Sequence, residues 1–316
     1  MSHTPVMLNE VLNGLNLAKD SIVVDLTLGR GGHSKEILKR IPNGHLYAFD
    51  QDEEAIKESK EILSEVSSNF TLIHDNFTTL NDYLAFYKVK GVDAILIDLG
   101  VSSPQFDKPD RGFSYRFDGP LDMRMDQKGN HLTAEIILNT YSYENLVRIF
   151  REYGEHKFAY RIARKIIDAR EIKPLTRTLE LVDVIKSALP MKELKKVGHP
   201  AKTIFQALRI EVNDELNALK DVLVESLKAL NKDGRLAVIT FHSLEDRITK
   251  HTFSEISTIN KGRRVPMRLP AHEDKPPYEL VNRRVIIAKE EEIINNPRAK
   301  SAKLRIIKRN GGKDER

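Results

Sequence analysis

The amino-acid sequence predicts an α/β fold: a doubly wound, mostly parallel sheet into which a helical subdomain is inserted. The first hundred residues alternate short apolar segments with helical stretches, which is typical of βαβ units whose sheet is covered on both faces. Strand patterning then stops for 137 residues, from Asp98 to Arg235, whereas a crossover containing one helix needs only about 30. Most of that interval is therefore expected to be an insertion.

Seven apolar segments are predicted to be strands, and they span residues 22–25, 46–50, 70–74, 94–98, 235–241, 284–288 and 303–308. Helix formers at helical spacing over 34–40 and 53–66 predict the helices between the first strands. Residues 99–130 are rich in Gly, Pro, Ser and Asp, which favours an irregular loop. Helical patterning follows, and one helix over 204–230 is expected to return the chain to the sheet.

These elements predict three segments along the chain. Residues 1–106 and 206–316 are expected to form one α/β domain, whose second part ends in a basic hairpin, and residues 107–205 are expected to form the helical insertion. A chain that leaves after the fourth strand leaves from the carboxyl edge of the sheet, where open α/β folds bind ligands. The insertion is therefore predicted to cap the active site and to recognise the substrate.

Composition and charge exclude several classes of protein. The chain has 316 residues, of which 40% are hydrophobic and 31% charged, and a net charge of +5, a balance typical of folded proteins. No apolar run approaches the ~18 residues that cross a bilayer, and no signal-peptide pattern opens the chain, so membrane spanning and secretion are not expected. Cysteine is absent, which excludes thiolate catalysis and favours a reducing cytoplasm. Residues 261–316 carry a net charge of +8, which indicates either a polyanionic partner or a solvated tail.

A glycine-rich turn follows the first predicted strand and opens a helix. Its glycines stand at positions 29, 31 and 32, a spacing that fits neither the dinucleotide fingerprint nor the phosphate-binding loop. An acidic residue before such a turn, here Asp25, suits an S-adenosylmethionine enzyme, although Thr27 stands where the generic pattern has its first glycine. Glycine permits close backbone approach to a ligand. A tight turn that binds nothing is the alternative.

Acidic and aromatic residues follow the next two strands. Asp50 ends the second strand about 20 residues after the glycines, where nucleotide-binding α/β folds place a carboxylate on ribose hydroxyls. Asp52 competes for this role, and an acidic residue that only starts a helix is the alternative. After the third strand, the segment from His74 to Phe77 offers polar groups and a ring suited to an adenine edge and face, although Phe77 could equally belong to the core.

The segment from Asp98 to Phe106 leaves the fourth strand. Its tetrapeptide Ser103-Pro104-Gln105-Phe106 approximates the Asp/Asn/Ser-Pro-Pro-Tyr/Phe pattern that amino-methyltransferases carry at this position. The exocyclic amine of a base is a poor nucleophile, so oxygen acceptors for its N–H groups and a ring that stacks on the flipped base would favour its methylation. Direct transfer needs no strong general base, because the nitrogen becomes acidic as it is methylated. A Ser-Pro turn capped by Asp98 is the alternative.

Further motifs occur in order along nearly the whole chain, and they are His3-Thr4-Pro5-Val6-Met7, Gly29-Arg30-Gly31-Gly32-His33-Ser34, Asp98-Leu99-Gly100-Val101-Ser102-Ser103-Pro104-Gln105, Arg111-Gly112-Phe113-Ser114, Gly119-Pro120-Leu121-Asp122-Met123-Arg124-Met125, Tyr153-Gly154-Glu155, Thr203-Ile204-Phe205-Gln206-Ala207-Leu208-Arg209-Ile210 and Ser243-Leu244-Glu245-Asp246-Arg247. Together they resemble the bacterial 16S ribosomal RNA cytosine-N4-methyltransferase family (RsmH, also called MraW). The resemblance implies a class I methyltransferase fold, with a Rossmann-like seven-stranded sheet. It also implies methylation of the exocyclic amine of a decoding-centre cytidine in the assembled small subunit.

The resemblance further implies S-adenosylmethionine as cofactor, with contacts that map onto Gly31, Gly32, His33, Asp50, Phe77, Asp98 and Gln105. If Gln105 serves the cofactor, the catalytic candidates for holding the cytosine amine are Ser102, Ser103 and Pro104, with Phe106 for stacking. No metal is expected, since no His-Glu-x-x-His pattern or carboxylate cluster is seen. His242, after the fifth strand, is either a site residue or a satisfied core histidine.

The expected partner is 16S ribosomal RNA within the small subunit, and the sequence leaves a homodimer open. Candidate RNA contacts in the insertion are basic residues interleaved with aromatic ones, namely Arg148, Arg151, Arg161, Arg164, Lys165 and Arg170 with Tyr153, Phe158 and Tyr160. Candidates in the tail are Arg298, Lys300, Lys303, Arg305, Lys308 and Arg309. Solvated surface is the alternative for both sets. Three other functions are weighed: methylation of DNA or of a protein glutamine amide, a non-catalytic ribosome-assembly module, and a dehydrogenase, which the glycine spacing disfavours.

Overall fold

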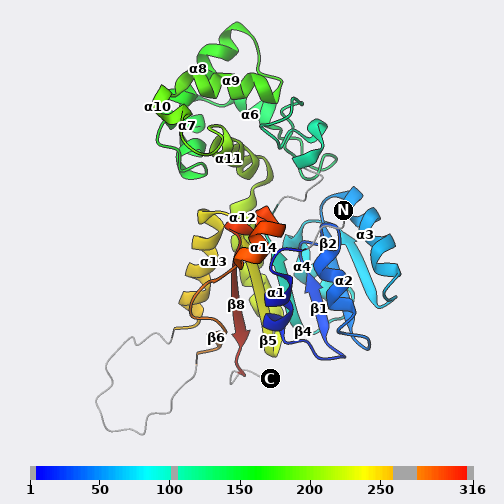
Figure 1. The fold of residues 1–316 in the computed structure, drawn as a ribbon. Helices are drawn as coiled ribbons and strands as arrows, with labels where there is room; N and C mark the ends of the chain where they lie inside the picture. Colours follow the sequence, from blue (N-terminus) through cyan, green and yellow to red (C-terminus); the bar gives the residue numbers. More distant parts are fainter. Residues whose placement is uncertain (1–4, 101–105, 259–275, 312–316) are drawn as a thin grey trace, which may run out of the picture. The chain divides into compact units, whose positions relative to one another are not determined.

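The computed structural model describes residues 5–100, 106–258 and 276–311, and the chain divides into two compact units (Figure 1). The first, here called the sheet unit, comprises Met1–Gly100 and Ala218–Arg316. The second, the helical unit, comprises Val101–Asn217. The helical unit is therefore inserted between two parts of the sheet unit, and each unit has its own core.

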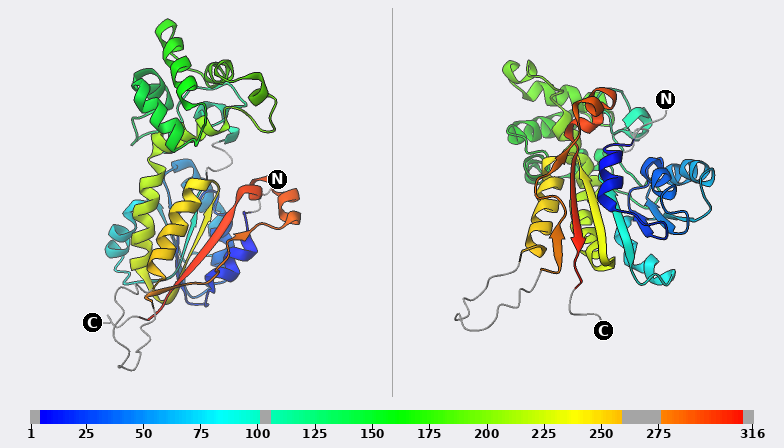
Figure 2. Two further views of the ribbon diagram at one scale, coloured as in Figure 1. Left: turned by 90° about the vertical axis from the view of Figure 1, so that its left-hand side faces the viewer. Right: turned by 60° about the horizontal axis from the view of Figure 1, so that its bottom comes forward.

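One mixed sheet of eight strands organises the sheet unit: seven follow the order β3-β2-β1-β4-β5-β8-β6, and the eighth, β7 (Ile286–Ile287), also pairs with β8. Five of them are mutually parallel, and their bounds are β1 (Ile22–Asp25), β2 (His45–Asp50), β3 (Phe70–His74), β4 (Val92–Asp98) and β5 (Leu230–Thr240). The last strand of the chain, β8 (Lys303–Arg309), runs antiparallel beside β5, as both views of Figure 2 show. This sheet confirms the predicted class I methyltransferase fold.

The far edge of β8 differs from the expected arrangement. The segment 284–288 forms only the two-residue strand β7 (Ile286–Ile287), and β6 (Tyr278–Leu280) was not predicted. Both pair with the same edge of β8, β6 near its end and β7 near its start. An edge strand this short and interrupted has little apolar alternation, so periodicity could not identify it.

Helices cover both faces of the sheet because neighbouring strand residues point to opposite sides. On β4, Ala94 and Leu96 pack in one apolar cluster, and Ile95 and Ile97 pack in the other. The first face is covered by α1 (Leu8–Leu15), α2 (Gly32–Leu38), α3 (Glu53–Ser64), α14 (Glu290–Asn295) and the short helix η3 (Pro297–Ser301). The second face is covered by α4 (Leu80–Phe86), α12 (Glu215–Ala229) and α13 (Ser243–Ile256).

The helical unit contains the short helix η2 (Pro109–Arg111) and then α6 (Ala134–Thr140), α7 (Tyr143–Glu152), α8 (Ala159–Ile172), α9 (Thr178–Ala188), α10 (Met191–Leu194) and α11 (Lys202–Asn213). Side-chain caps start two of them, because Thr133 accepts a hydrogen bond from the N–H of Ile136 and Ser142 accepts one from the N–H of Asn145. Their apolar faces meet in one core. No helix in the described part of the chain is long and apolar enough to span a bilayer.

The prediction of one helix over 204–230 is wrong. Asp214 adopts a left-handed conformation (φ 48°, ψ 38°) that ends α11, and α12 begins at the next residue. The side chain of Asn213 is hydrogen-bonded to the backbone of the loop that precedes α6. Its Oδ1 accepts from the N–H of Met125 and its Nδ2 donates to the carbonyl of Met123, each at 2.8 Å. Arg209 and Glu215 form a doubly hydrogen-bonded ion pair across the break, at 2.7 Å for each bond. These tertiary bonds override a continuous helical pattern.

Candidate active site

Asp25 fixes the turn that follows β1. It is buried, and its carboxyl accepts hydrogen bonds from the N–H of Thr27 at 3.1 Å and from the hydroxyl of Ser34 at 2.6 Å. Burial raises the pKa of this carboxyl to about 6, against the lowering effect of those hydrogen bonds. Asp25 therefore ties the strand end to α2 and adds negative charge to the interior.

The glycines of the turn are required by its packing. Gly31 has φ +69°, and a Cβ placed there would lie 3.3 Å from the Cβ of Ser59 on α3. A Cβ on Gly32 would lie 2.6 Å from Cγ of Pro5, closer than real contacts allow. The hydroxyl of Ser59 also donates to the carbonyl of Gly29 at 2.8 Å. These positions are thus shaped by neighbouring residues, whether or not a ligand also approaches them.

Asp50 and Asp52 have different surroundings. Asp50, at the end of β2, accepts hydrogen bonds from the N–H of Gly29 at 2.8 Å and from the N–H of Asp52 at 2.9 Å. Burial raises the pKa of the Asp50 carboxyl to about 7, with smaller contributions from the charges of Asp52 and Asp25. Asp52 caps α3 by accepting from the N–H of Glu54 at 3.1 Å. Of the two residues, Asp52 is therefore the one that starts the helix. This leaves Asp50 as the better candidate for a hydrogen bond to the ribose hydroxyls.

His33 is buried at the start of α2 and is neutral. Its Nε2 lies 3.0 Å from the carbonyl oxygen of Val6. Because a carbonyl only accepts, Nε2 must hold the ring proton and Nδ1 is left as an acceptor. Burial lowers the pKa of the imidazole to about 4, so it stays neutral at physiological pH.

Asp98 ends β4 and lies beside His33, with its Oδ2 3.6 Å from Nδ1 of the imidazole. Burial raises the pKa of Asp98 to about 8, and the charges of Asp25 and Glu245 raise it further. Oδ1 is buried and has no hydrogen-bond partner among the described residues. A buried acceptor without a partner is costly, so this atom is suited to a donor or a cation from a ligand.

Thr27 explains why the generic glycine is absent from this turn. Its hydroxyl oxygen accepts a hydrogen bond from the N–H of Asp98 at 2.6 Å, and the same hydroxyl bonds to the carboxyl of Asp25. Thr27 therefore links the ends of β1 and β4. In the sequence, Thr27 stands out only as a departure from a pattern, because its partner Asp98 lies 71 positions away.

Phe77 begins the short helix η1 (Phe77–Thr79) after β3 and is partly buried against the core of the second sheet face. Asn76 caps that helix and donates to the side-chain oxygen of Gln51 at 3.1 Å. The ends of β2 and β3 are thereby joined. This position is compatible with both roles considered for Phe77, a core residue and a ring that contacts adenine.

His242 is a helix cap. It precedes α13, where its side chain accepts from the N–H of Glu245 and the carboxylate of Glu245 accepts from the N–H of His242 at 3.2 Å. Nε2 of His242 also lies 2.9 Å from Oε1 of Glu245. This capping box accounts for a polar residue at that position without a catalytic role.

The structure thus gathers a subset of the expected site residues. Asp25, His33, Asp50 and Asp98 follow or end adjacent strands of the sheet, and Phe77 follows the next strand. Ser102, Ser103, Pro104 and Gln105 lie outside the described residues. Phe106 is described, in the helical unit, and its side chain is 36% exposed.

The tail cations are mostly bonded within the fold. Lys303 and Arg305 both pair with Asp246, at 2.9 and 2.8 Å, and Lys308 pairs with Glu279 at 2.7 Å. Arg309 donates to backbone carbonyls at the end of α12 and the start of β5. These residues hold β8 in the sheet, which leaves less free charge for phosphate than the sequence count predicts.

A model of the MraW methylase family matches residues 1–310. The chain belongs to the MraW methylase family. It is accordingly an S-adenosylmethionine-dependent methyltransferase that acts on N4 of cytidine 1402 in 16S ribosomal RNA. This confirms the activity, the cofactor and the ribosomal RNA substrate expected from the sequence motifs.

Solved structures similar to this chain include an rRNA methylase from Streptococcus thermophilus, with 14% identity, a TM-score of 0.41 and coverage of 96% of this chain and 92% of that one. A protein from Streptococcus mutans, solved in complex with SAH, has 14% identity and a TM-score of 0.42, with coverage of 98% and 99%. At these values the family assignment rests on the match to the family model.

The residues at the carboxyl edge of the sheet fit the cofactor of this family. S-adenosylmethionine carries a sulfonium and an ammonium charge, and the edge holds three carboxyls whose pKa values are raised to about 6, 7 and 8. Carboxyls whose pKa is raised by burial are stabilised as anions by a nearby cation. The Oδ1 of Asp98, which has no hydrogen-bond partner among the described residues, provides an acceptor for such a ligand.

Proposed function

We propose that Gly31, Gly32, His33, Asp50, Phe77, Asp98 and Gln105 hold S-adenosylmethionine during methylation of the cytidine. The observation that carries this assignment is Asp98: a buried carboxyl with one oxygen that no described residue bonds, beside a histidine that is neutral. A neutral His33 adds no positive charge to compete with a cationic ligand. Asp50 already accepts two backbone hydrogen bonds and has further lone pairs for ribose hydroxyls.

The bound cofactor supplies an electrophilic methyl group, and the chain supplies binding and orientation. Ser102, Ser103 and Pro104 are proposed to hold the exocyclic amine through side-chain and backbone oxygens, with Phe106 stacking on the flipped cytosine. Alignment of the amine with the methyl donor accounts for much of the acceleration expected of such a site. We infer direct transfer without a covalent intermediate, consistent with a chain that has no cysteine.

The proposed substrate form is the assembled small subunit rather than free RNA, and the proposed compartment is the cytoplasm, where bacterial subunits are assembled. The helical unit is proposed to recognise the RNA, since its surface carries exposed cations and aromatic rings. The oligomeric state is tested with the same preparation: a homodimer would double the mass measured by light scattering.

The experiment compares methyl transfer to purified small subunits, free 16S ribosomal RNA, duplex DNA and a glutamine-containing protein. We expect transfer to small subunits only, with the modified cytidine located by mass spectrometry of nuclease fragments. Transfer to free RNA at an equal rate would contradict the proposed substrate form. A trapped adduct between the protein and cytosine would contradict direct transfer.

A further inference from the structure

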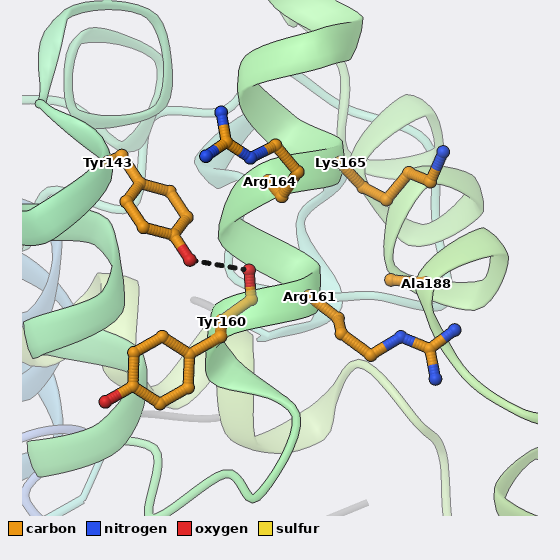
Figure 3. A pocket seen from close by; sticks show the side chains of 6 residues that line it. All are labelled: Tyr143, Tyr160, Arg161, Arg164, Lys165 and Ala188. Atoms are coloured by element: carbon orange, nitrogen blue, oxygen red, sulfur yellow. Dashed lines mark hydrogen bonds between the residues drawn. The ribbon is translucent and has the colours of Figure 1, made fainter.

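The helical unit carries a hollow of about 330 Å³ that does not belong to the sheet-edge site. Figure 3 shows its lining, contributed by α7, α8 and α9, and the residues are Tyr143, Tyr160, Arg161, Arg164, Lys165 and Ala188. Three of the lining side chains are cationic, two are aromatic and none is acidic. This chemistry suits a ligand that combines an anion with a planar ring.

Helix geometry places the three cations together. Arg161, Arg164 and Lys165 stand at positions i, i+3 and i+4 of α8, so they share one face of that helix. All three are exposed, while Ile162 and Ile166 on the opposite face are buried in the core of the unit. The cations are therefore presented to solvent by a helix whose other side is fixed by packing.

The charges of α8 are only weakly compensated. In the part of the chain that the structure describes, neither Arg161 nor Arg164 forms an ion pair with a carboxylate, and Lys165 lies 3.9 Å from an equally exposed Asp168. Hydrogen bonds from its own backbone and from Ser142 lower the pKa of Glu144, and the charge of Arg164 contributes less. Glu144 does not line the hollow.

Other basic residues of this unit are committed elsewhere. Arg148 pairs with Glu211 at 2.8 Å, and Arg170 donates to the carbonyls of Leu138 and Tyr141 at the end of α6. Only part of the basic series that the sequence suggested is thus available to an anion, and three of its members, Arg161, Arg164 and Lys165, line one hollow.

The two rings are held in position before any ligand arrives. The hydroxyl of Tyr143 donates to the carbonyl of Tyr160 at 3.5 Å, and the guanidinium of Arg164 lies 4.6 Å from the centre of the Tyr143 ring (Figure 3). Tyr160 is 51% exposed, and Arg151 donates to its hydroxyl at 2.7 Å. An exposed ring with restricted motion loses less entropy when a base stacks on it.

We propose that this hollow binds a nucleotide of a single-stranded RNA segment other than the target cytidine, with its phosphate among Arg161, Arg164 and Lys165 and its base on Tyr160. Guanidinium groups bind phosphate through paired hydrogen bonds, and stacking on a tyrosine tolerates any base. The inference rests on the proposed function, because the ribosomal RNA substrate supplies the segment. It adds a second RNA contact, made by other residues than those that hold the reacting amine.

The test uses the full-length chain and two variants of the hollow, R161Q/R164Q and Tyr160→Ala. A labelled oligouridine serves as the probe for binding, and unmethylated small subunits serve as the substrate. For R161Q/R164Q we expect weaker oligouridine binding and a salt dependence shallower by about 0.7 in log–log slope per lost phosphate contact. Tyr160→Ala should weaken binding about 5- to 140-fold, the equivalent of one stacked base, and Tyr160→Phe, which keeps the ring but loses the bond from Arg151, should retain most of it.

Both hollow variants should raise KM for small subunits, with kcat and the Kd for S-adenosylmethionine unchanged. The matched control is K57Q/K60Q, which removes two exposed cations at i and i+3 of α3. An equal effect in that control, or unchanged KM in the hollow variants, overturns the proposal. Circular dichroism and thermal unfolding identify a variant that fails to fold, in which case the single variants R161Q and R164Q take its place.

Two further outcomes are distinguishable from these. If KM for subunits rises while binding of oligouridine and free 16S ribosomal RNA is unchanged, the partner of the hollow is a ribosomal protein and the RNA proposal fails. If the unmodified chain methylates no cytidine in any subunit preparation, the proposed function fails instead, whatever the oligouridine titration gives.

Discussion

His33 and Asp98 face each other at the carboxyl edge of the sheet: Nδ1 of the imidazole, which carries no proton, lies 3.6 Å from Oδ2 of the carboxyl. The ring proton is on Nε2, bonded to Val6, and burial holds the pKa of the imidazole near 4. Burial also raises the pKa of Asp98 to about 8. Without a ligand, the carboxyl is therefore mostly protonated at neutral pH, and a bound cation would favour its ionised form.

The first prediction concerns the pH dependence of cofactor binding. The pKa values of Asp50 and Asp98, raised to about 7 and 8, mean that a cationic ligand must displace protons at neutral pH. S-adenosylmethionine binding should therefore release protons near pH 7 and weaken as the pH falls from about 8.5 to about 6. Calorimetry in buffers of different ionisation enthalpy measures the released protons.

The neutral product S-adenosylhomocysteine is the matched control for that experiment, because it lacks the sulfonium charge. Its binding should depend less on pH and release fewer protons than binding of the methyl donor. Identical proton release for the two ligands would show that the carboxyls do not sense the sulfonium.

The second prediction concerns the free energy of unfolding of Asp98→Asn. A carboxyl whose pKa is raised in the folded state destabilises the fold as the pH rises from about 4, and the loss is complete above about 8. The asparagine variant has no such loss. Its unfolding temperature should exceed that of the parent chain at about pH 8.5, and the difference should shrink toward pH 5.

The same substitution should weaken binding of S-adenosylmethionine, since it removes the charge from the proposed cofactor site. Thermal unfolding across the pH range, followed by calorimetry at pH 8.5, checks both effects. Asp233→Asn is the control, because Asp233 is a highly exposed carboxylate and its replacement should change neither quantity appreciably. A pH-independent difference between Asp98→Asn and the parent would contradict the raised pKa.

The third prediction separates the two acidic residues after β2. Asp50→Ala removes the acceptor of two backbone hydrogen bonds and of the proposed ribose contact, so affinity for S-adenosylmethionine should fall by about 1–3 kcal/mol. Asp52→Ala removes the same charge and the cap of α3, so it should cost about 1 kcal/mol of stability and little affinity. Calorimetric titration and urea unfolding measure the two quantities. Equal losses of affinity would move the ribose contact to Asp52.

Much of the sheet unit could be predicted from the sequence because its strands are short, apolar and separated by helices. The carboxyl ends of β1, β2, β3 and β4 coincide with the predicted ones, since each is marked by a polar residue after an apolar run. The edge strand β6 was missed, and the strand predicted over 284–288 is only the two-residue β7, because pairing with β8 and not their own periodicity defines these strands. The break at Asp214 was missed for a related reason, as the bonds that fix it come from a distant loop.

The candidate site, too, could be predicted only in part from the sequence. Motifs indicated His33, Asp50 and Asp98 by position, but only the structure gives the tautomer of His33 and the pKa values that couple these groups to a cation. Tertiary contacts were also needed to tell which arginines of α7 and α8 lack a carboxylate partner. Arg148 and Arg164 look alike in sequence, but among the described residues only Arg148 forms an ion pair with a carboxylate.

The last prediction concerns Thr27, whose hydroxyl accepts the N–H of Asp98 at 2.6 Å. Thr27→Val keeps the size of the side chain but leaves that N–H without its acceptor, which should lower the free energy of unfolding by about 1–3 kcal/mol. Thr27→Ser keeps the hydroxyl and loses one methyl group, so its loss should be smaller. The bond from Thr27 also lowers the pKa of Asp25, so the valine variant should raise that pKa further above its usual value. Urea unfolding of both variants compares the losses, and equal destabilisation by valine and serine would show that the hydroxyl does not join β1 to β4.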